Sequence, residues 1–223
     1  MTQRVEIRRL EDLDCAEQSV GLPVGPRVGR SQEKKEWFVL INFLKAAIPY
    51  GMVEVPITVR NGVPPLEPDF TMSRAGALVG LFEITEATVK ADQKELTAIE
   101  RSTREVAMRG DFGGRFKDAA SRPGIIWAAD IVDAIRRKSG KVIFQDSPAA
   151  RHLIIYPNSS ASVLLFREHD ERNAVDDLRA AIAKDIGALS QMTNGCYVHV
   201  LGAYLVCLDT LGALEVLTRG LRA

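Results

Sequence analysis

Asp69 and Glu83 are the side chains whose type and spacing best suit metal-dependent chemistry in this 223-residue chain. Asp69 follows Pro68, and Glu83 comes fourteen positions after Asp69. Neighbouring β-strands lie about 4.8 Å apart, so two carboxylates on adjacent strands converge on one point. Carboxylate oxygens are hard ligands that suit Mg²⁺ or Mn²⁺. The pair therefore predicts a divalent metal site.

Glu83 stands in an apolar segment that predicts a central β-strand. Residues 77–85 are rich in Leu, Val, Phe and Ile, and alternation places apolar side chains on both faces. Glu83 and Thr85 share one face of this strand, whereas Phe82 and Ile84 point the other way. Burying a carboxylate that has no partner costs several kcal/mol. A bound metal ion is one partner that would remove this cost.

The pattern Pro68-Asp69, then Glu83-Ile84-Thr85, resembles the core of the PD-(D/E)XK nuclease superfamily, which has the restriction-endonuclease-like fold. The resemblance implies that Asp69 and Glu83 hold Mg²⁺ or Mn²⁺ and that the carbonyl of Ile84 adds a ligand. It also implies hydrolysis of phosphodiester bonds in DNA or RNA. The family core runs helix, three strands, helix, strand, and residues 31–157 can be divided in that order.

The sequence departs from the family at Thr85, which stands where the family has a Lys. A Thr hydroxyl can orient a water molecule but carries no positive charge, so the expected activity is reduced. In some divergent members of the family, a basic residue from the next helix replaces the strand Lys. The candidates here are Lys138 and Lys141, with Lys90 and Lys94 as further choices.

The first helix of the family often contributes another acidic residue near the metal, and Glu36 is the candidate, with Glu33 as the alternative. Residues 31–48 are predicted to form this helix, because Ser31 suits an N-cap and apolar residues follow at helical spacing. Glu36 lies beside the apolar stripe. Two solvated carboxylates favoured by the helix dipole are the other interpretation.

The remaining core elements are predicted from alternation, helical spacing and turn residues. They are a strand at 53–60, a hairpin turn at Asn61-Gly62, strands at about 66–72 and 77–85 with a turn at 73–76, a helix at 123–138 with Ile125, Ala128, Val132 and Ile135 on its apolar side, and a strand at 152–156. His152 is interpreted as a strand-end side chain and His199 as a satisfied core residue.

The chain is predicted to be an α/β protein with an N-terminal extension at 1–30 and a single nuclease-like domain at 31–223. The extension holds a short strand and a helical turn. A charged insert at about 86–122 would lie beside the active site, as a flap, a partner-binding arm or a solvated segment. A helix at about 171–189, capped by Asp170, precedes a β-prone segment at 196–209 and a terminal hairpin with 213–217.

Composition narrows the expected partners. The chain is 46% hydrophobic, and its formal net charge is zero, from 29 basic and 29 acidic residues. Nucleic-acid-binding proteins usually carry a basic footprint, so binding of DNA or RNA would need a local basic patch. Three cysteines without a CxxC pair predict reduced thiols and a cytoplasmic protein. No apolar run approaches the ~20 residues of a membrane span, and a homo-oligomer is compatible with the sequence.

Two other hypotheses compete with a metal-dependent nuclease. The first is a catalytically silent nuclease-fold module that binds protein or nucleic acid through its charged insert. The second is an unrelated α/β fold in which the spacing of Asp69 and Glu83 is coincidental. Among other chemistries, the sequence contains no GxGxxG, GxxxxGK[ST], GxSxG or HExxH pattern in a suitable context.

Overall fold

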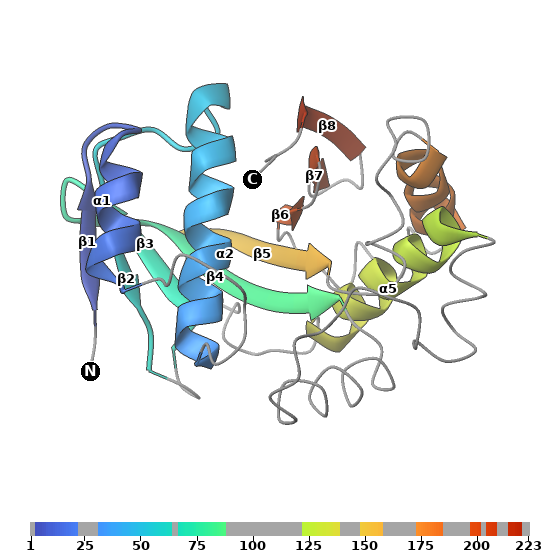
Figure 1. The fold of residues 1–223 in the computed structure, drawn as a ribbon, viewed down its shortest axis with the longest axis horizontal. Coiled ribbons are helices and arrows are strands. Elements are labelled where there is room, and N and C mark those ends of the chain that lie inside the picture. Colours follow the sequence, from blue (N-terminus) through green and yellow to red (C-terminus); the bar gives the residue numbers. More distant parts are fainter. Residues whose placement is uncertain are drawn as a thin grey trace, which may run out of the picture.

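The computed structural model describes residues 3–21, 31–63, 67–87, 122–138, 148–157, 173–184, 197–201, 204–208 and 214–219 (Figure 1). The elements in chain order are β1 (Arg4–Ile7), α1 (Asp12–Ser19), α2 (Gln32–Ala47), the 3-10 helix η1 (Ile48–Tyr50), β2 (Ile57–Asn61), β3 (Phe70–Arg74), β4 (Ala77–Ala87), α5 (Pro123–Lys138), β5 (Ala150–Pro157), β6 (Tyr197–Leu201), β7 (Tyr204–Leu208) and β8 (Leu214–Arg219). Residues 173–184 form a further helix.

The strands of the described part form one mixed eight-stranded sheet in the order β1 to β8. Neighbours from β1 to β4 are antiparallel, β4–β5 and β5–β6 are parallel, and β6 to β8 are antiparallel again. Each parallel pair needs a crossover connection. Helix α5 lies between β4 and β5 in the chain, and the helix of residues 173–184 lies between β5 and β6. The α/β class is therefore confirmed.

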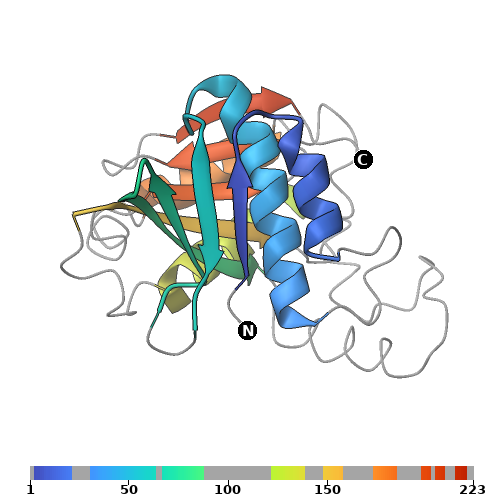
Figure 2. The same ribbon diagram turned by 90° about the vertical axis from the view of Figure 1, so that its left-hand side faces the viewer.

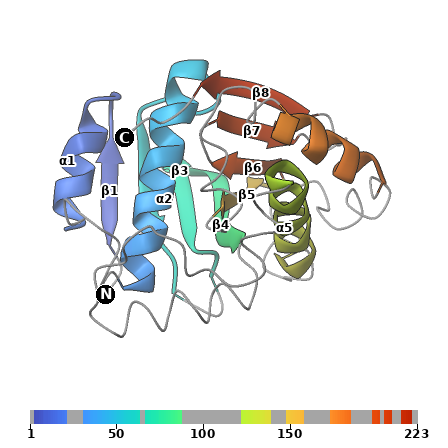
Figure 3. The ribbon, with the colours of Figure 1, turned by 45° about the vertical axis from the view of Figure 1, so that its right-hand side comes forward.

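Two hydrophobic clusters cover opposite faces of this sheet. Phe82 and Ile154 pack with α2, whereas Leu153 and Ile155 pack with α5 and the helix of residues 173–184. Consecutive strand residues point to opposite faces, so the clusters on Leu153 and Ile154 must lie on different sides of β5. Figure 2 shows α1 and α2 together beside β1, and Figure 3 shows α5 beside the helix of residues 173–184. None of the described helices is both long and apolar enough to span a membrane.

Helix α2 begins and ends where the sequence predicts. The Oγ of Ser31 accepts a hydrogen bond from the backbone N–H of Lys34 at 3.3 Å, which is N-capping by the predicted residue. The helix ends at Ala47 and continues as η1, after which Gly51 has a φ of 70°. Left-handed φ is accessible to glycine at little cost. The chain can therefore leave the helix sharply at this point.

The hairpin of β2 and β3 differs from the predicted one. The strand begins at Ile57, not Val53, because Pro56 has no N–H for a sheet ladder. The predicted two-residue turn at Asn61-Gly62 is wrong, since Asn61 pairs with Phe70 and the N–H of Gly62 donates to the carbonyl of Asp69 at 2.9 Å. The longer loop moves the start of β3 from residue 66 to Phe70.

Helix α5 matches its predicted bounds, and its buried side includes three of the four predicted residues. Ala128, Val132 and Ile135 are buried, as expected, whereas Ile125 is 51% exposed. Trp127, Ile131 and Ala134 are buried as well. The helix is covered by both the sheet and the helix of residues 173–184, so its buried face is broader than a single stripe, and Ile125 lies outside it.

The two ends of the chain also join the sheet. Strand β1, in the predicted N-terminal extension, pairs with β2, and Ile7 and Leu13 are buried in the cluster that includes α2. The β-prone segment predicted as one strand at 196–209 contains the antiparallel pair β6 and β7, and β8 then pairs with β7. Gly202 is a turn signal within that segment that the prediction did not use. Most of the predicted insert, residues 88–121, lies outside the described residues, as do Asp170, Lys90, Lys94 and Lys141.

Candidate functional site

Asp69 and Glu83 lie side by side where β3 meets the second half of β4. Phe70 pairs with Phe82 in the antiparallel β3–β4 ladder. Asp69 directly precedes Phe70, and Glu83 directly follows Phe82. In antiparallel strands, these two positions face each other across the pair. The structure thus brings the two predicted carboxylates to adjacent positions.

The carboxylate of Asp69 is tied to the backbone of β4. Its Oδ2 accepts a hydrogen bond from the N–H of Ile84 at 2.7 Å. The partner is the residue after Glu83, so this bond holds the Asp69 side chain against the part of β4 that carries Glu83. The side chain is half-buried, which leaves it partly accessible to solvent.

Glu83 is an acidic residue with no exposed surface, and a cation lies against it. Lys138 Nζ donates to Glu83 Oε2 at 2.8 Å, and the two side chains are 19% and 0% exposed, respectively. Lys138 is the last residue of α5, so this ion pair joins that helix to β4. Removing one partner of a buried pair typically costs about 3–5 kcal/mol, because the other charge stays buried.

Glu36 belongs to the same group of charges. Its side chain is half-buried on α2, and its Oε1 accepts a hydrogen bond from Gln32 Nε2 at 2.8 Å. Burial raises the pKa of Glu36. The hydrogen bond from Gln32 and the positive charge of Lys138 oppose the rise in pKa, and the negative charges of Asp69 and Glu83 add to it. Glu36 is therefore close enough to sense all three charged residues.

Glu33, the alternative acid, is directed to another partner. Its Oε1 accepts a hydrogen bond from Asn61 Nδ2 at 2.8 Å, and Asn61 Oδ1 accepts one from the N–H of Gln3 at 2.6 Å. Glu33 thereby links α2 to β2 and to the chain just before β1. Of the two acids weighed on α2, Glu36 is the one that the structure brings into the group with Asp69 and Glu83.

Thr85 and Ile84 complete the predicted set. Thr85 is half-buried and lies two residues after Glu83, so both side chains point to the same face of β4. Ile84 is buried on the opposite face, against the α2 cluster. The N–H of Ile84 is the group that holds Asp69. The positions of Glu83 and Thr85 agree with the predicted alternation.

Lys138 is the residue of this group that the sequence named only as one of several candidates. Helical spacing could have placed Lys138 on the buried side of α5. Lys138 continues the buried positions Trp127, Ile131 and Ala134 at intervals of three to four residues. A Lys at the end of a buried stripe packs its apolar stem against the core and turns its ammonium toward a polar partner. Here that partner is Glu83.

The donor atoms of the group are carboxylate oxygens, which suit Mg²⁺ or Mn²⁺. Among the described residues, no group of three or more His, Cys, Asp and Glu side chains is arranged to hold a metal ion. Mg²⁺ in proteins is commonly bound by one or two carboxylates together with waters and substrate phosphates. Asp69 and Glu83 fit that smaller donor set.

The chain was compared with protein-family models, curated proteins and solved structures, and none of them matches.

Proposed function

We propose that this protein is a nuclease of restriction-endonuclease-like fold that uses Mg²⁺ or Mn²⁺ to hydrolyse phosphodiester bonds in DNA or RNA. The order of elements supports the fold. Helix α2, strands β2, β3 and β4, helix α5 and strand β5 follow the order of the PD-(D/E)XK core. Asp69 directly precedes β3, and Glu83 lies on the next strand, β4.

The observation that carries the proposal is the contact of 2.8 Å between Lys138 Nζ and Glu83 Oε2. Thr85 cannot supply the positive charge that the family places two residues after the Glu. Lys138 brings an ammonium group to the same carboxylate from α5. The charge set of two acids and one Lys is thereby present, although the Lys comes from a different element.

Asp69, Glu83 and the carbonyl of Ile84 are the groups that would hold the ion. A divalent ion at these groups lowers the pKa of a bound water and neutralises charge on the scissile phosphate. The hydrogen bond from Ile84 N–H fixes the orientation of Asp69. Lys138 offers further N–H donors beyond the one given to Glu83, and one of them can bind the attacking water or a phosphate oxygen. The Thr85 hydroxyl can orient the same water.

Cleavage assays with single substitutions test this proposal. The full chain is incubated with supercoiled plasmid, single-stranded DNA and RNA in Mg²⁺, with EDTA as the blank. Lys138→Met is expected to lower the cleavage rate about a hundredfold or more, as loss of one charge-stabilising group does in other enzymes. Asp69→Asn and Glu83→Gln are expected to abolish cleavage.

Arg136→Met is the matched control. Arg136 lies in the same basic last turn of α5, but it is exposed and pairs with Asp133 at 3.2 Å. This substitution removes one positive charge without touching Glu83 and should leave the rate unchanged. Equal rates for the wild type, Asp69→Asn and Lys138→Met would rule the proposal out.

A catalytically silent module is the second candidate, and the same ion pair favours it. A buried carboxylate that is already neutralised by Lys138 needs no metal ion for its burial. On this account, the wild type cleaves none of the three substrates in Mg²⁺. Lys138→Met would still destabilise the fold, because Glu83 would lose its cation.

A further inference from the structure

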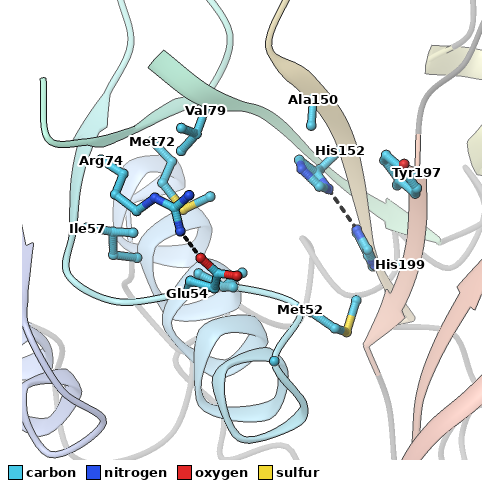
Figure 4. A pocket seen from close by; sticks show the side chains of 12 residues that line it. Met52, Glu54, Ile57, Met72, Arg74, Val79, Ala150, His152, Tyr197 and His199 are labelled. Atoms are coloured by element: carbon cyan, nitrogen blue, oxygen red, sulfur yellow. Dashed lines mark hydrogen bonds and ion pairs between the residues drawn. The ribbon is translucent and has the colours of Figure 1, made fainter. Parts of the chain in front are cut away.

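A second candidate site lies at the end of β3 and the start of β4, away from Asp69 and Glu83. It is a cavity of about 450 Å³, bounded by the chain after α2, the end of β3 and the starts of β5 and β6 (Figure 4). Its lining combines apolar side chains with a few polar groups, notably His152, His199, Tyr197 and Arg74. Cavities of this size and character are typical of sites for small molecules.

His152 and His199 form one polar wall of this cavity. The Nδ1 of His152 and the Nε2 of His199 are 3.0 Å apart. The ring centroids are 5.3 Å apart and the ring planes differ by 23°. This centroid separation equals the nitrogen distance plus the two ring radii, so the rings meet edge to edge in a direct hydrogen bond rather than by stacking.

Both histidines are neutral at physiological pH. Burial lowers the pKa of His152 to about 4. Burial, and then the nearby His152, lower the pKa of His199 as well. In a neutral pair, one of the two nitrogens in contact donates to the other. Of the remaining ring nitrogens, His152 Nε2 and His199 Nδ1, one is then a donor and the other an acceptor. This wall of the cavity therefore carries no charge.

An aromatic row leads to the same cavity. Phe82, His152 and Tyr197 are cross-strand neighbours on β4, β5 and β6. His152 stacks on Phe82 with centroids 4.6 Å apart and planes 12° apart, and Tyr197 lies 5.5 Å from His152 with planes 22° apart. Tyr197 is 41% exposed. Tyr197 thus presents an accessible ring that is roughly parallel to the ring of His152.

Arg74 and Glu54 stand across the cavity from the histidines (Figure 4). They form an ion pair at the rim. The pair offers guanidinium donors and carboxylate acceptors side by side, with their charges already matched. A flat molecule with donors and acceptors along one edge could bond to both groups without bringing a charge of its own.

From these features we propose that the cavity binds a neutral planar heteroaromatic molecule of the nucleobase class, stacked on Tyr197 and hydrogen-bonded at its polar edge. An aromatic face suits any base, and base–aromatic stacking is typically worth about 1–3 kcal/mol. The guanidinium donors and carboxylate acceptors of Arg74 and Glu54 match the mixed edges of a base. The inference does not depend on the nuclease proposal, since Asp69 and Glu83 do not line this cavity.

The test is calorimetric titration of the full chain with adenosine, guanosine, cytidine and uridine, and separately with inorganic phosphate. At least one nucleoside is expected to bind, and phosphate alone is not. Tyr197→Ala should weaken that binding about tenfold, given the usual strength of stacking. Val79→Trp, which replaces a small side chain of the cavity wall with a large ring, should also block binding.

Ile125→Ala and Asp69→Asn are the controls. Ile125 is an exposed apolar residue of α5 that does not line the cavity, and both variants should bind like the wild type. Unchanged binding in Asp69→Asn separates this site from the proposed nuclease site. The inference is overturned if no nucleoside binds, if phosphate binds as tightly as the nucleosides, or if Tyr197→Ala binds them unchanged.

Discussion

The effect of the neighbouring charges on Glu36 can be measured through the free energy of unfolding. Its pKa is raised by burial and by the negative charges of Asp69 and Glu83. A carboxyl whose folded pKa lies above its unfolded pKa stabilises the fold below the unfolded pKa, and this contribution is lost as the pH rises through the folded pKa. At neutral pH, the ionised Glu36 therefore destabilises the fold.

We therefore expect Glu36→Gln to raise the free energy of unfolding at pH 7 and to have little effect at a pH below the unfolded value of 4.5. The Gln side chain can still accept the hydrogen bond from Gln32. Urea unfolding at both pH values measures the difference. A variant that is less stable than the wild type at pH 7 would show that Glu36 is held by an attraction instead.

The residue scale also shows what the sequence could and could not predict. The approach of Asp69 to Glu83 could be predicted, because the spacing of the two acids and the strand pattern around them are present in the sequence itself. The choice of Lys138 required knowing how α5 packs on β4, since Lys138 and Glu83 are fifty-five positions apart. The Ile84 N–H bond to Asp69 was equally out of reach, because it depends on the loop that starts β3 at Phe70.

At the scale of the element, α2 depends on its cap for a defined start. The Ser31 Oγ satisfies the N–H of Lys34. Ser31→Ala removes this bond and should lower the free energy of unfolding by about 1 kcal/mol. Ser31→Asp keeps an acceptor at the same position and should restore most of the loss. Denaturant unfolding of both variants is the measurement, and equal stability of all three proteins would contradict this role.

The buried contact of His152 on β5 with His199 on β6 should make the free energy of unfolding depend on pH. His152 has a pKa of about 4 in the folded protein and 6.5 in the reference state. Between these values the unfolded chain binds more protons, so the free energy of unfolding falls as the pH decreases. The slope is about 1.4 kcal/mol per pH unit for each such histidine.

The double substitution His152→Phe, His199→Phe tests this contribution, because it removes both protonation sites and keeps an aromatic ring at each position. Thermal or urea unfolding between pH 4 and 6.5 should show a shallower pH dependence in this variant than in the wild type. The same slope in both proteins would mean that the two histidines are already protonated in the folded state.

Elements with strong local signals were predicted well. Ser31 for α2 and Pro123 for α5 mark helix starts through their own backbone chemistry. The β2–β3 connection was not predicted correctly, because the hairpin signal of Asn61-Gly62 was overridden by pairing of Asn61 with Phe70. The buried face of α5 is broader than predicted and excludes Ile125, since a second helix covers it as well.

At the scale of the whole molecule, one sheet carries both the acidic group of Asp69 and Glu83 and the cavity with His152 and His199. The acidic group lies where β3 begins and β4 nears its end, and the cavity with His152 and His199 lies at the opposite ends of the same strands. Each region can be altered by substitutions that leave the other in place.

Central to the proposed function is that the carboxylates of Asp69 and Glu83 together bind one divalent cation. Anomalous diffraction from a crystal of the full chain soaked in Mn²⁺ tests it most directly. We expect one anomalous peak within bonding distance of oxygens from both residues, and we expect the peak to be lost in Asp69→Asn. A saturated crystal with no peak there, and with the Lys138 ammonium still on Glu83, would contradict it.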